Sequence, residues 1–197
     1  MNKTKIFNFI RKILFKNLLS EKIIVTFSNG KELSSFFWKI PANYYQYSPN
    51  TIRLVKRNDI NYKLDISDYM EWLIYFGIRT EPRETLYDLA KNAKVIFDIG
   101  ANVGETTLNF AKITNDNAIV HSFEPSDLCF NKLVYNISLN TFRNIVVNSF
   151  GLGETEASYY LSPDFDNNRG GNRIRLNSQN KHNIQIKKMA SRILYTM

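Results

Sequence analysis

The stretch that decides the fold is Val95-Ile-Phe-Asp-Ile-Gly-Ala-Asn-Val-Gly104. Its first five residues are almost all apolar, which is typical of a parallel strand covered on both faces. We therefore expect a buried central strand at residues 95–99. Gly100 and Gly104 predict a tight turn from this strand into a helix, because glycine adopts positive φ angles at no steric cost and lets a ligand approach the backbone closely.

The helix after this turn is expected to begin with a capping box. In that arrangement the side chain of Asn102 caps the helix, and the side chain of Glu105 reaches back to the cap. The inward face of the helix follows from apolar and small residues at helical spacing. These residues are Val103, Thr107, Phe110 and Ala111.

Two more strands are expected further along the chain. A strand at residues 118–123 ends at Glu124-Pro125, and Ser126 can then cap a second helix. The third strand is expected at residues 144–150. The order strand, helix, strand, helix, strand predicts an α/β fold built on half of a doubly wound sheet.

The residues before 95 are expected to form a cap region. Residues 53–55 and 62–64 flank Asn58-Asp59, which predicts a hairpin with a polar turn. A helix is expected at residues 82–92, because Pro82 suits the first turn of a helix. Its apolar face would carry Leu86, Leu89 and Ala90.

The formal net charge of +8 is concentrated at the two ends of the chain. Residues 95–168 hold three basic and nine acidic residues, whereas the residues from 169 onward hold seven basic residues and no acidic one. A folded basic face for specific nucleic-acid binding is therefore not expected. The single cysteine, Cys129, excludes an internal disulfide and a multi-cysteine zinc site, which indicates a cytoplasmic protein without a metal site.

The first 25 residues have the composition of a basic amphipathic helix. Six basic residues stand against Glu21 alone, and apolar residues recur at helical spacing from Ile6 to Leu19. Two interpretations follow: a helix that lies on an anionic membrane surface, giving peripheral membrane contact, or a helix that packs on its own domain. No stretch reaches the roughly 18 apolar residues that a membrane span requires.

The side chains that suggest a ligand stand at the ends of neighbouring strands. Ligands of doubly wound sheets bind across the carboxyl ends of the strands. Asp98 can hold an ammonium group there, and the two oxygens of Glu124 can accept the hydroxyl hydrogens of a ribose. We expect Glu124 to contribute little to stability, because it stands at the tip of a strand.

The turn itself argues against a dinucleotide. A dinucleotide would favour glycine where Asn102 stands, and the acidic residues around the turn would repel its phosphates. S-adenosylmethionine carries an ammonium, a sulfonium and a ribose but no phosphate. The residues therefore favour S-adenosylmethionine as the cofactor, with a nicotinamide-dependent oxidoreductase as a weaker hypothesis.

The sequence also resembles the FkbM family of S-adenosylmethionine-dependent methyltransferases over residues 70–175. The motifs that carry the resemblance keep the order and spacing of that family. They are Val95-Ile-Phe-Asp-Ile-Gly-Ala-Asn-Val-Gly-Glu-Thr-Thr, His121-Ser-Phe-Glu-Pro-Ser, Asn140 and Gly151-Leu-Gly-Glu. The resemblance implies a Rossmann-like class I methyltransferase fold and methyl transfer to a hydroxyl oxygen of a sugar, glycan or natural product.

Carried over residue by residue, the resemblance implies a cofactor site. Asp98, Gly100, Asn102 and Gly104 would line the methionine end, Glu124 would bind the ribose, and Leu152 would pack against the adenine ring. Together with the patterns described above, it leads us to expect four segments in the chain. These are a basic amphipathic helix at 1–25, a cap region at 26–94, the front half of the methyltransferase domain at 95–186 and a basic tail at 187–197.

Past Gly170-Gly171 the sequence departs from the family pattern. The acidic helix start and the fourth strand of the family are absent, so we expect a sheet that is incomplete at the C-terminus. The strand at 95–99 would then be an exposed edge and prone to self-association. Two functional hypotheses follow: an S-adenosylmethionine-dependent O-methyltransferase, or a remnant that at most binds the cofactor and gives no measurable turnover.

Overall fold

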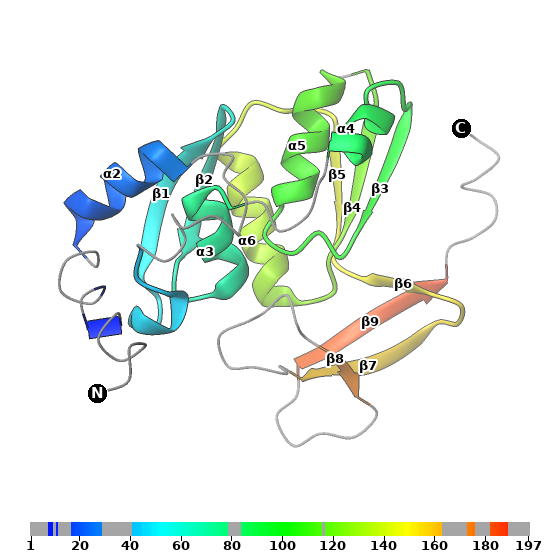
Figure 1. The fold of residues 1–197 in the computed structure, drawn as a ribbon. Helices are drawn as coiled ribbons and strands as arrows, with labels where there is room; N and C mark the ends of the chain where they lie inside the picture. Colours follow the sequence, from blue (N-terminus) through cyan, green and yellow to red (C-terminus); the bar gives the residue numbers. More distant parts are fainter. Residues whose placement is uncertain are drawn as a thin grey trace. The chain divides into compact units, whose positions relative to one another are not determined.

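The computed structural model describes residues 8–9, 11, 17–28, 41–78, 84–115, 117–162, 173–175 and 182–188. Contacts between residues divide the chain into two compact units, Met1–Pro82 and Arg83–Met197. Figure 1 shows the elements of both units. The division into four segments expected from the sequence stays a prediction. Within the described ranges, no helix is long and apolar enough to cross a membrane.

The first unit contains the predicted hairpin. Strands β1 (Ile52–Arg57) and β2 (Ile60–Asp65) pair antiparallel, with Arg57 opposite Ile60. Between them Asn58 and Asp59 both have positive φ angles, of 47° and 61°. Two successive left-handed residues characterise the turn whose twist matches that of the two strands, and asparagine and aspartate tolerate this conformation. The hairpin prediction is therefore confirmed.

Helix α3 (Tyr69–Phe76) supplies five buried apolar residues to the core of this unit. The side chain of Asp68 caps it by accepting hydrogen bonds from two backbone N–H groups, and Gly77 ends it with a left-handed φ of 69°. The indole Nε1 of Trp72 donates to the carbonyl oxygen of Ala42 at 2.9 Å, next to the short 3-10 helix η2 (Tyr44–Gln46). The buried apolar residues of α3 and β2 pack together as the core. They are Trp72, Leu73, Ile74, Tyr75, Phe76, Ile60, Tyr62 and Leu64.

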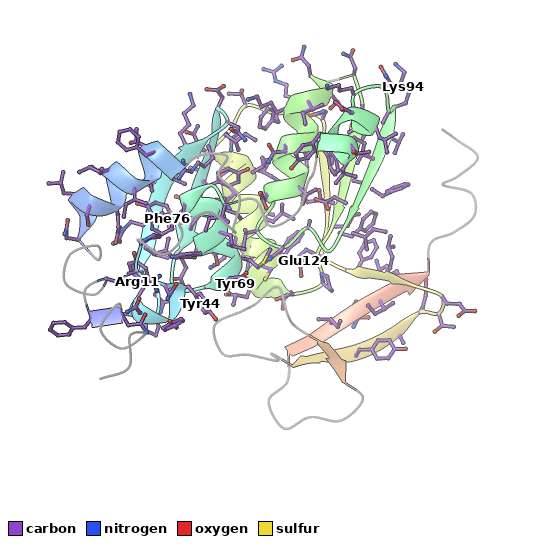
Figure 2. All side chains as sticks on the ribbon, in the orientation of Figure 1. Arg11, Tyr44, Tyr69, Phe76, Lys94 and Glu124 are labelled. Atoms are coloured by element: carbon purple, nitrogen blue, oxygen red, sulfur yellow. The ribbon has the colours of Figure 1, made fainter. Side chains whose placement is uncertain are left out.

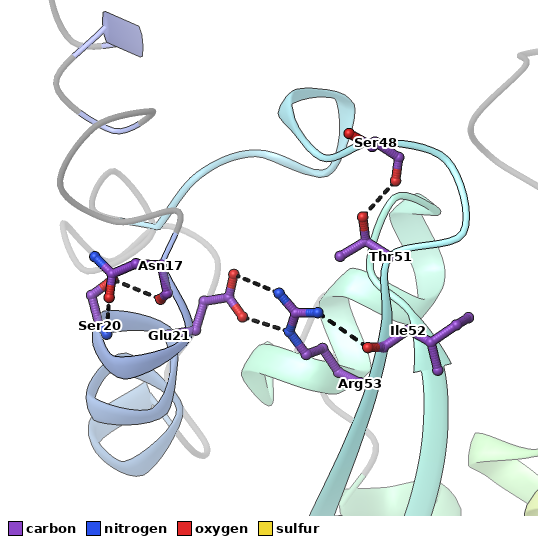
Figure 3. Close-up of polar contacts among 7 residues, drawn as sticks. All are labelled: Asn17, Ser20, Glu21, Ser48, Thr51, Ile52 and Arg53. Atoms are coloured by element: carbon purple, nitrogen blue, oxygen red, sulfur yellow. Dashed lines mark hydrogen bonds and ion pairs between the residues drawn. The ribbon is translucent and has the colours of Figure 1, made fainter.

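Helix α2 (Leu18–Ser28) is held to the hairpin by a buried ion pair. The carboxylate of Glu21 is fully buried and accepts hydrogen bonds from Nε of Arg53 at 2.7 Å and from Nη2 at 3.2 Å (Figure 3). Nη1 of Arg57 donates to the carbonyl oxygen of Val25 at 2.8 Å. One side of α2 therefore packs on its own unit. Most of the residues before 17 lie outside the described residues.

The second unit contains a parallel sheet of three strands in the order β3-β4-β5. The strands are β3 (Val95–Ile99), β4 (Ile119–Phe123) and β5 (Ile145–Asn148). Helices α5 (Glu105–Thr114) and α6 (Asp127–Ser138) connect them. Sequential strands that are joined by helices and lie side by side form one half of a doubly wound sheet. The predicted α/β class with a parallel sheet is therefore confirmed.

The position of β3 in the sheet corrects one expectation. The sequence predicts a buried central strand at 95–99, but within the described residues β3 pairs only with β4 and Ile99 is 63% exposed. The central strand is β4, where Val120 is fully buried. An apolar run indicates that the side chains of a strand can be covered on both faces, but it does not indicate how many strands pair with it. The second expectation, an exposed edge at 95–99, agrees with this arrangement.

One face of the sheet packs against α4 (Glu84–Ala90) and α5 (Figure 1). The buried centre of this core is formed by Ala90, Phe110, Ala111 and Val120, and the ring of Tyr87 packs edge-on against Phe110 at 5.8 Å. The predicted apolar face of α4 is correct for Ala90 and wrong for Leu86 and Leu89, whose side chains are exposed. Tyr87 lies three residues before Ala90, on the same face of the helix, and it takes the inward position.

A second sheet of four strands follows β5. Its strand order is β6-β9-β7-β8, and β6 and β9 run parallel while the other pairs run antiparallel. The strands are β6 (Gly151–Gly153), β7 (Ala157–Ser162), β8 (Arg173–Arg175) and β9 (His182–Lys188). The predicted third strand at 144–150 is thus shorter than expected, since β5 ends at Asn148 and a bend separates it from β6.

Backbone hydrogen bonds show which residues of β3 face β4. The N–H of Ile119 donates to the carbonyl oxygen of Lys94, and the N–H of Gly100 donates to that of Phe123, both at 2.9 Å. Because alternate residues of a strand direct their backbone groups to opposite sides, the even-numbered residues face β4. The backbone N–H and C=O groups of Val95, Phe97 and Ile99 therefore point away from β4, to the edge of β3 that pairs with no described strand.

Proline substitutions along β3 should reveal this alternation. Val95→Pro removes an N–H that faces the open edge, where proline is tolerated. Ile96→Pro removes an N–H that faces β4 and leaves a ladder carbonyl unpaired, so it should lower the free energy of unfolding by about 1–3 kcal/mol more. Urea unfolding of each variant, compared with alanine at the same position, measures the difference. Equal losses at the two positions would contradict an open edge.

Candidate functional site

The turn after β3 lies at the carboxyl edge of the parallel sheet, where ligands of such sheets bind. The N–H groups of Gly100 and Ala101 both donate to the carbonyl oxygen of Phe123, at 2.9 and 3.1 Å. Three of its residues are left-handed, with φ angles of 84° at Gly100, 50° at Asn102 and 94° at Gly104. The predicted glycine turn is therefore confirmed, and it is tied to the end of the neighbouring strand β4.

The two glycines serve different purposes in this turn. A Cβ added to Gly100 would have no atom within 4 Å, so only the backbone angle and the open space beside it favour glycine. A Cβ added to Gly104 would lie 2.7 Å from Cδ1 of Leu133, a fully buried side chain of α6. Gly100 therefore leaves the backbone open to a ligand, whereas Gly104 lets α5 and α6 approach each other.

The predicted capping box is wrong. The N-cap of α5 is Gly104, which has no side chain, and no side chain from that position caps the helix. Asn102 lies two residues earlier in a left-handed conformation. Its side-chain Oδ1 is buried and has no hydrogen-bond partner among the described residues. Asparagine is common both at helix caps and in left-handed turns, so the sequence alone does not distinguish the two roles.

The backbone N–H of Asn102 is bound by Glu124, the residue that follows β4. Oε2 of Glu124 accepts this N–H at 2.8 Å, and Oε1 accepts the N–H of Ser126 at 2.9 Å. Glu124 is buried, and Figure 2 shows it at the end of the sheet opposite Lys94, which precedes β3. The carboxylate therefore joins the turn after β3 to the start of α6.

This arrangement changes two expectations. Glu124 was expected to matter little for stability, but it is buried and holds two backbone N–H groups. Burial raises the pKa of this carboxyl group, and the N–H groups of Ser126 and Asn102 partly offset that shift. Ser126 does occupy the predicted N-cap position of α6, but its side chain makes no capping bond. Its backbone N–H donates to Glu124.

A short hydrogen-bonded chain holds Asp98 beneath the turn. Oδ2 of Asp98 accepts the hydroxyl of Thr107 at 2.5 Å, and the same hydroxyl oxygen lies 2.8 Å from Oγ of Ser122. All three residues are buried. Thr107 was expected on the inward face of α5 without a role in the site, and Ser122 was not expected to contribute. A polar residue at an inward helical position beside a strand-end acid is the signal that could have identified the contact.

Asn136 is a further residue that sequence reasoning missed. Its amide Nδ2 donates to the carbonyl oxygen of Val103 at 2.9 Å, and its side chain is fully buried in α6. Together with Glu124, it fixes the glycine turn from the α6 side. In the sequence, Asn136-Ile137-Ser138 matches a glycosylation acceptor motif. That match does not predict the structural role of the amide.

Leu152, the last of the six predicted residues, lies on β6 and is half-buried. It follows Gly151, where an added Cβ would lie 3.6 Å from Cγ of Pro125. The chain at Leu152 therefore runs close to the residue after Glu124. His121 and Cys129 make structural contacts. The rings of His121 and Phe97 pack together with 5.4 Å between their centroids, and Cys129 is buried in α6.

The described side chains around the turn include several hydrogen-bond acceptors. Asp98 and Glu124 carry carboxylates close enough for the charge of Asp98 to raise the pKa of Glu124, and Asn102 adds an amide oxygen. Within the described ranges, no cluster of three or more metal-ligating side chains occurs. Such a group of acceptors suits a ligand that brings N–H or O–H groups, or a positive charge.

Among known proteins, the chain has a partial likeness to solved structures. No family model and no curated protein matches the chain. The chain is similar to P. horikoshii TYW2 in complex with MeSAdo, with 27% identity, a TM-score of 0.38 and coverage of 52% of this chain and 37% of that one. It is also similar to M. jannaschii TYW2 in complex with AdoMet, with 22% identity, a TM-score of 0.39 and coverage of 51% and 44%.

The chain thus spans less than half the length of each of these solved chains. A likeness of this extent assigns neither a family nor an activity. The FkbM resemblance and the roles of the six site residues stay predictions.

Proposed function

We propose that the second unit binds S-adenosylmethionine at the carboxyl edge of β3 and β4, and that the protein is a methyltransferase of the FkbM type. The observation that carries the proposal is the set of acceptors around the turn: the carboxylates of Asp98 and Glu124 and the unpartnered Oδ1 of Asn102. An orphaned buried oxygen is costly unless a ligand supplies a donor. The ammonium group of the cofactor supplies such a donor.

Glu124 can hold the ribose in addition to its backbone partners. Each of its oxygens accepts one N–H, and a carboxylate oxygen has two lone pairs. Each oxygen can therefore accept one ribose hydroxyl as well. Asp98 and Asn102 would bind the methionine end beside it, and Leu152 would border the adenine ring. The bound cofactor supplies the electrophilic methyl group, and the acidic surroundings favour its positive sulfonium.

The same geometry argues against a phosphate-bearing dinucleotide. Phosphates bind at glycine turns through free backbone N–H groups. Here the N–H of Asn102 already donates to Glu124 at 2.8 Å. A phosphate would compete with a buried carboxylate for this N–H and would be repelled by it. The nicotinamide hypothesis is therefore disfavoured.

For the acceptor, we propose a hydroxyl oxygen of a sugar, glycan or natural product, which rests on the family resemblance alone. The alternative is a chain that binds the cofactor without catalysis. Incubation with methyl-labelled S-adenosylmethionine and a panel of sugar and polyketide acceptors separates the two. Labelled product supports the methyltransferase, and tight cofactor binding without product in any acceptor favours the alternative.

Calorimetric titration with S-adenosylhomocysteine and with NAD tests the cofactor. We expect Glu124→Gln to weaken S-adenosylhomocysteine binding about 10-fold to 100-fold, since a hydrogen bond to a charged group contributes about 1.5–3 kcal/mol. The same substitution should also lower the free energy of unfolding by about 1–3 kcal/mol, because one of the two backbone N–H groups then faces an amide NH₂.

Glu156→Gln is the matched control, because it removes an exposed carboxylate from the same unit and lies outside the motifs of the resemblance. It should change neither quantity. Binding is compared at a temperature where circular dichroism shows that each variant is folded. An unchanged dissociation constant for Glu124→Gln would contradict the ribose assignment, and tight binding of NAD would contradict the choice of cofactor.

Substitutions of the two glycines test the turn. Gly100→Ala should cost about 1–2 kcal/mol of stability from backbone strain alone, because its Cβ meets no other atom. Gly104→Ala should cost about 1–3 kcal/mol more, because its Cβ also collides with the buried Leu133. Urea unfolding measures both. A smaller loss for Gly104→Ala than for Gly100→Ala would mean that α5 and α6 do not approach as closely as described.

Gly100→Val adds a test of ligand approach. A β-branched residue at positive φ is strongly disfavoured, so the turn must rearrange. We expect S-adenosylhomocysteine binding to be lost, as titration calorimetry would measure. Wild-type affinity in this variant would place the ligand away from the turn.

A further inference from the structure

Helix α2 turns a buried acid, Glu21, toward its own unit and exposes several large apolar side chains. The inward side carries Glu21, which is fully buried and paired with Arg53 (Figure 3). It also carries Val25, whose carbonyl oxygen accepts from Arg57. A surface helix normally buries its apolar stripe and exposes its charges. In α2 this order is reversed, because an ion pair rather than an apolar stripe attaches the helix to its unit.

The outward side carries an apolar stripe, defined by Leu19, Ile23 and Phe27. These residues are four apart and so lie on one face of the helix. Their exposed fractions are 72%, 53% and 66%. Single exposed apolar residues are ordinary on protein surfaces, but three large ones in a row along one helix indicate a surface that binds something.

The charges beside the stripe indicate what it binds. Residues 1–25 contain six basic residues and one acid, Glu21. Glu21 is buried and paired with Arg53 inside the unit, so this acid is not part of the exposed surface of α2. Lys22 is exposed on α2 next to the stripe. Anionic lipid attracts such cations and accepts apolar side chains between its headgroups. Nucleic acid would use the cations but not the stripe, and a protein partner would not require the basic excess.

We propose that α2 docks on an anionic lipid surface, with Leu19, Ile23 and Phe27 inserted between the headgroups and Lys22 against the phosphates. The ion pair between Glu21 and Arg53 fixes the outward direction of the stripe. The helix thus serves as a peripheral membrane anchor for the first unit, independently of any cofactor bound by the second.

Co-sedimentation of the full chain with lipid vesicles tests the proposal. We expect retention on mixed vesicles of phosphatidylcholine and phosphatidylserine, and little on phosphatidylcholine alone. Replacement of all three stripe residues by glutamine should reduce partitioning at least about 10-fold, since each buried apolar side chain contributes separately. Lys22→Glu should reduce it about 10-fold at low salt and much less at high salt.

The matched control is Leu54→Thr, which removes an equally exposed leucine (72%) from β1 of the same unit. It should leave partitioning unchanged. Circular dichroism checks that the triple variant is folded, and Lys22→Glu tests the proposal separately if that variant is not. Failure of the wild-type chain to bind the anionic vesicles would overturn the proposal. So would wild-type partitioning in the variants, or a stripe that changes only the oligomeric state in sedimentation velocity.

Discussion

The structure around the site depends on one buried carboxylate. Glu124 stands where the central strand β4 ends, and it accepts one N–H from the turn after β3 and one from the start of α6. Both crossovers of the parallel sheet therefore begin from the same side chain. Burial of a charge is unfavourable, as the raised pKa of the group shows, and the two backbone donors offset part of that penalty.

This constraint determines what the neighbouring residues can do. With its N–H bound to Glu124, Asn102 is held in a left-handed conformation and its side chain is not at the cap of α5. Gly104 takes the cap position and lets Leu133 pack closely beneath it. Asp98 is held separately through Thr107 and Ser122. The acceptors of the site are thus positioned by contacts that also hold the fold together, so binding and stability are coupled there.

Local chemistry in the sequence was sufficient to predict the hairpin and the glycine turn. Asn58-Asp59 and Gly100 are positions where backbone conformation follows from residue type. Features that depend on distant neighbours could not be predicted in this way. The apolar run at 95–99 is equally compatible with a central or an edge strand, and Asn102 is equally suited to a cap or a left-handed turn. Glu124 is buried where the turn after β3 meets the start of α6. No local sequence pattern predicts this contact between distant segments.

The alternation of backbone direction along β3 has a consequence for solvent exchange. Amide hydrogens of Ile96, Asp98 and Gly100 face β4, whereas those of Val95, Phe97 and Ile99 face the open edge. Exchange with deuterated water requires an amide to be released from its hydrogen bond. Within a single five-residue strand, protection should therefore rise and fall with a period of two residues. In β4, which is paired on both sides, neighbouring amides should instead exchange at similarly slow rates.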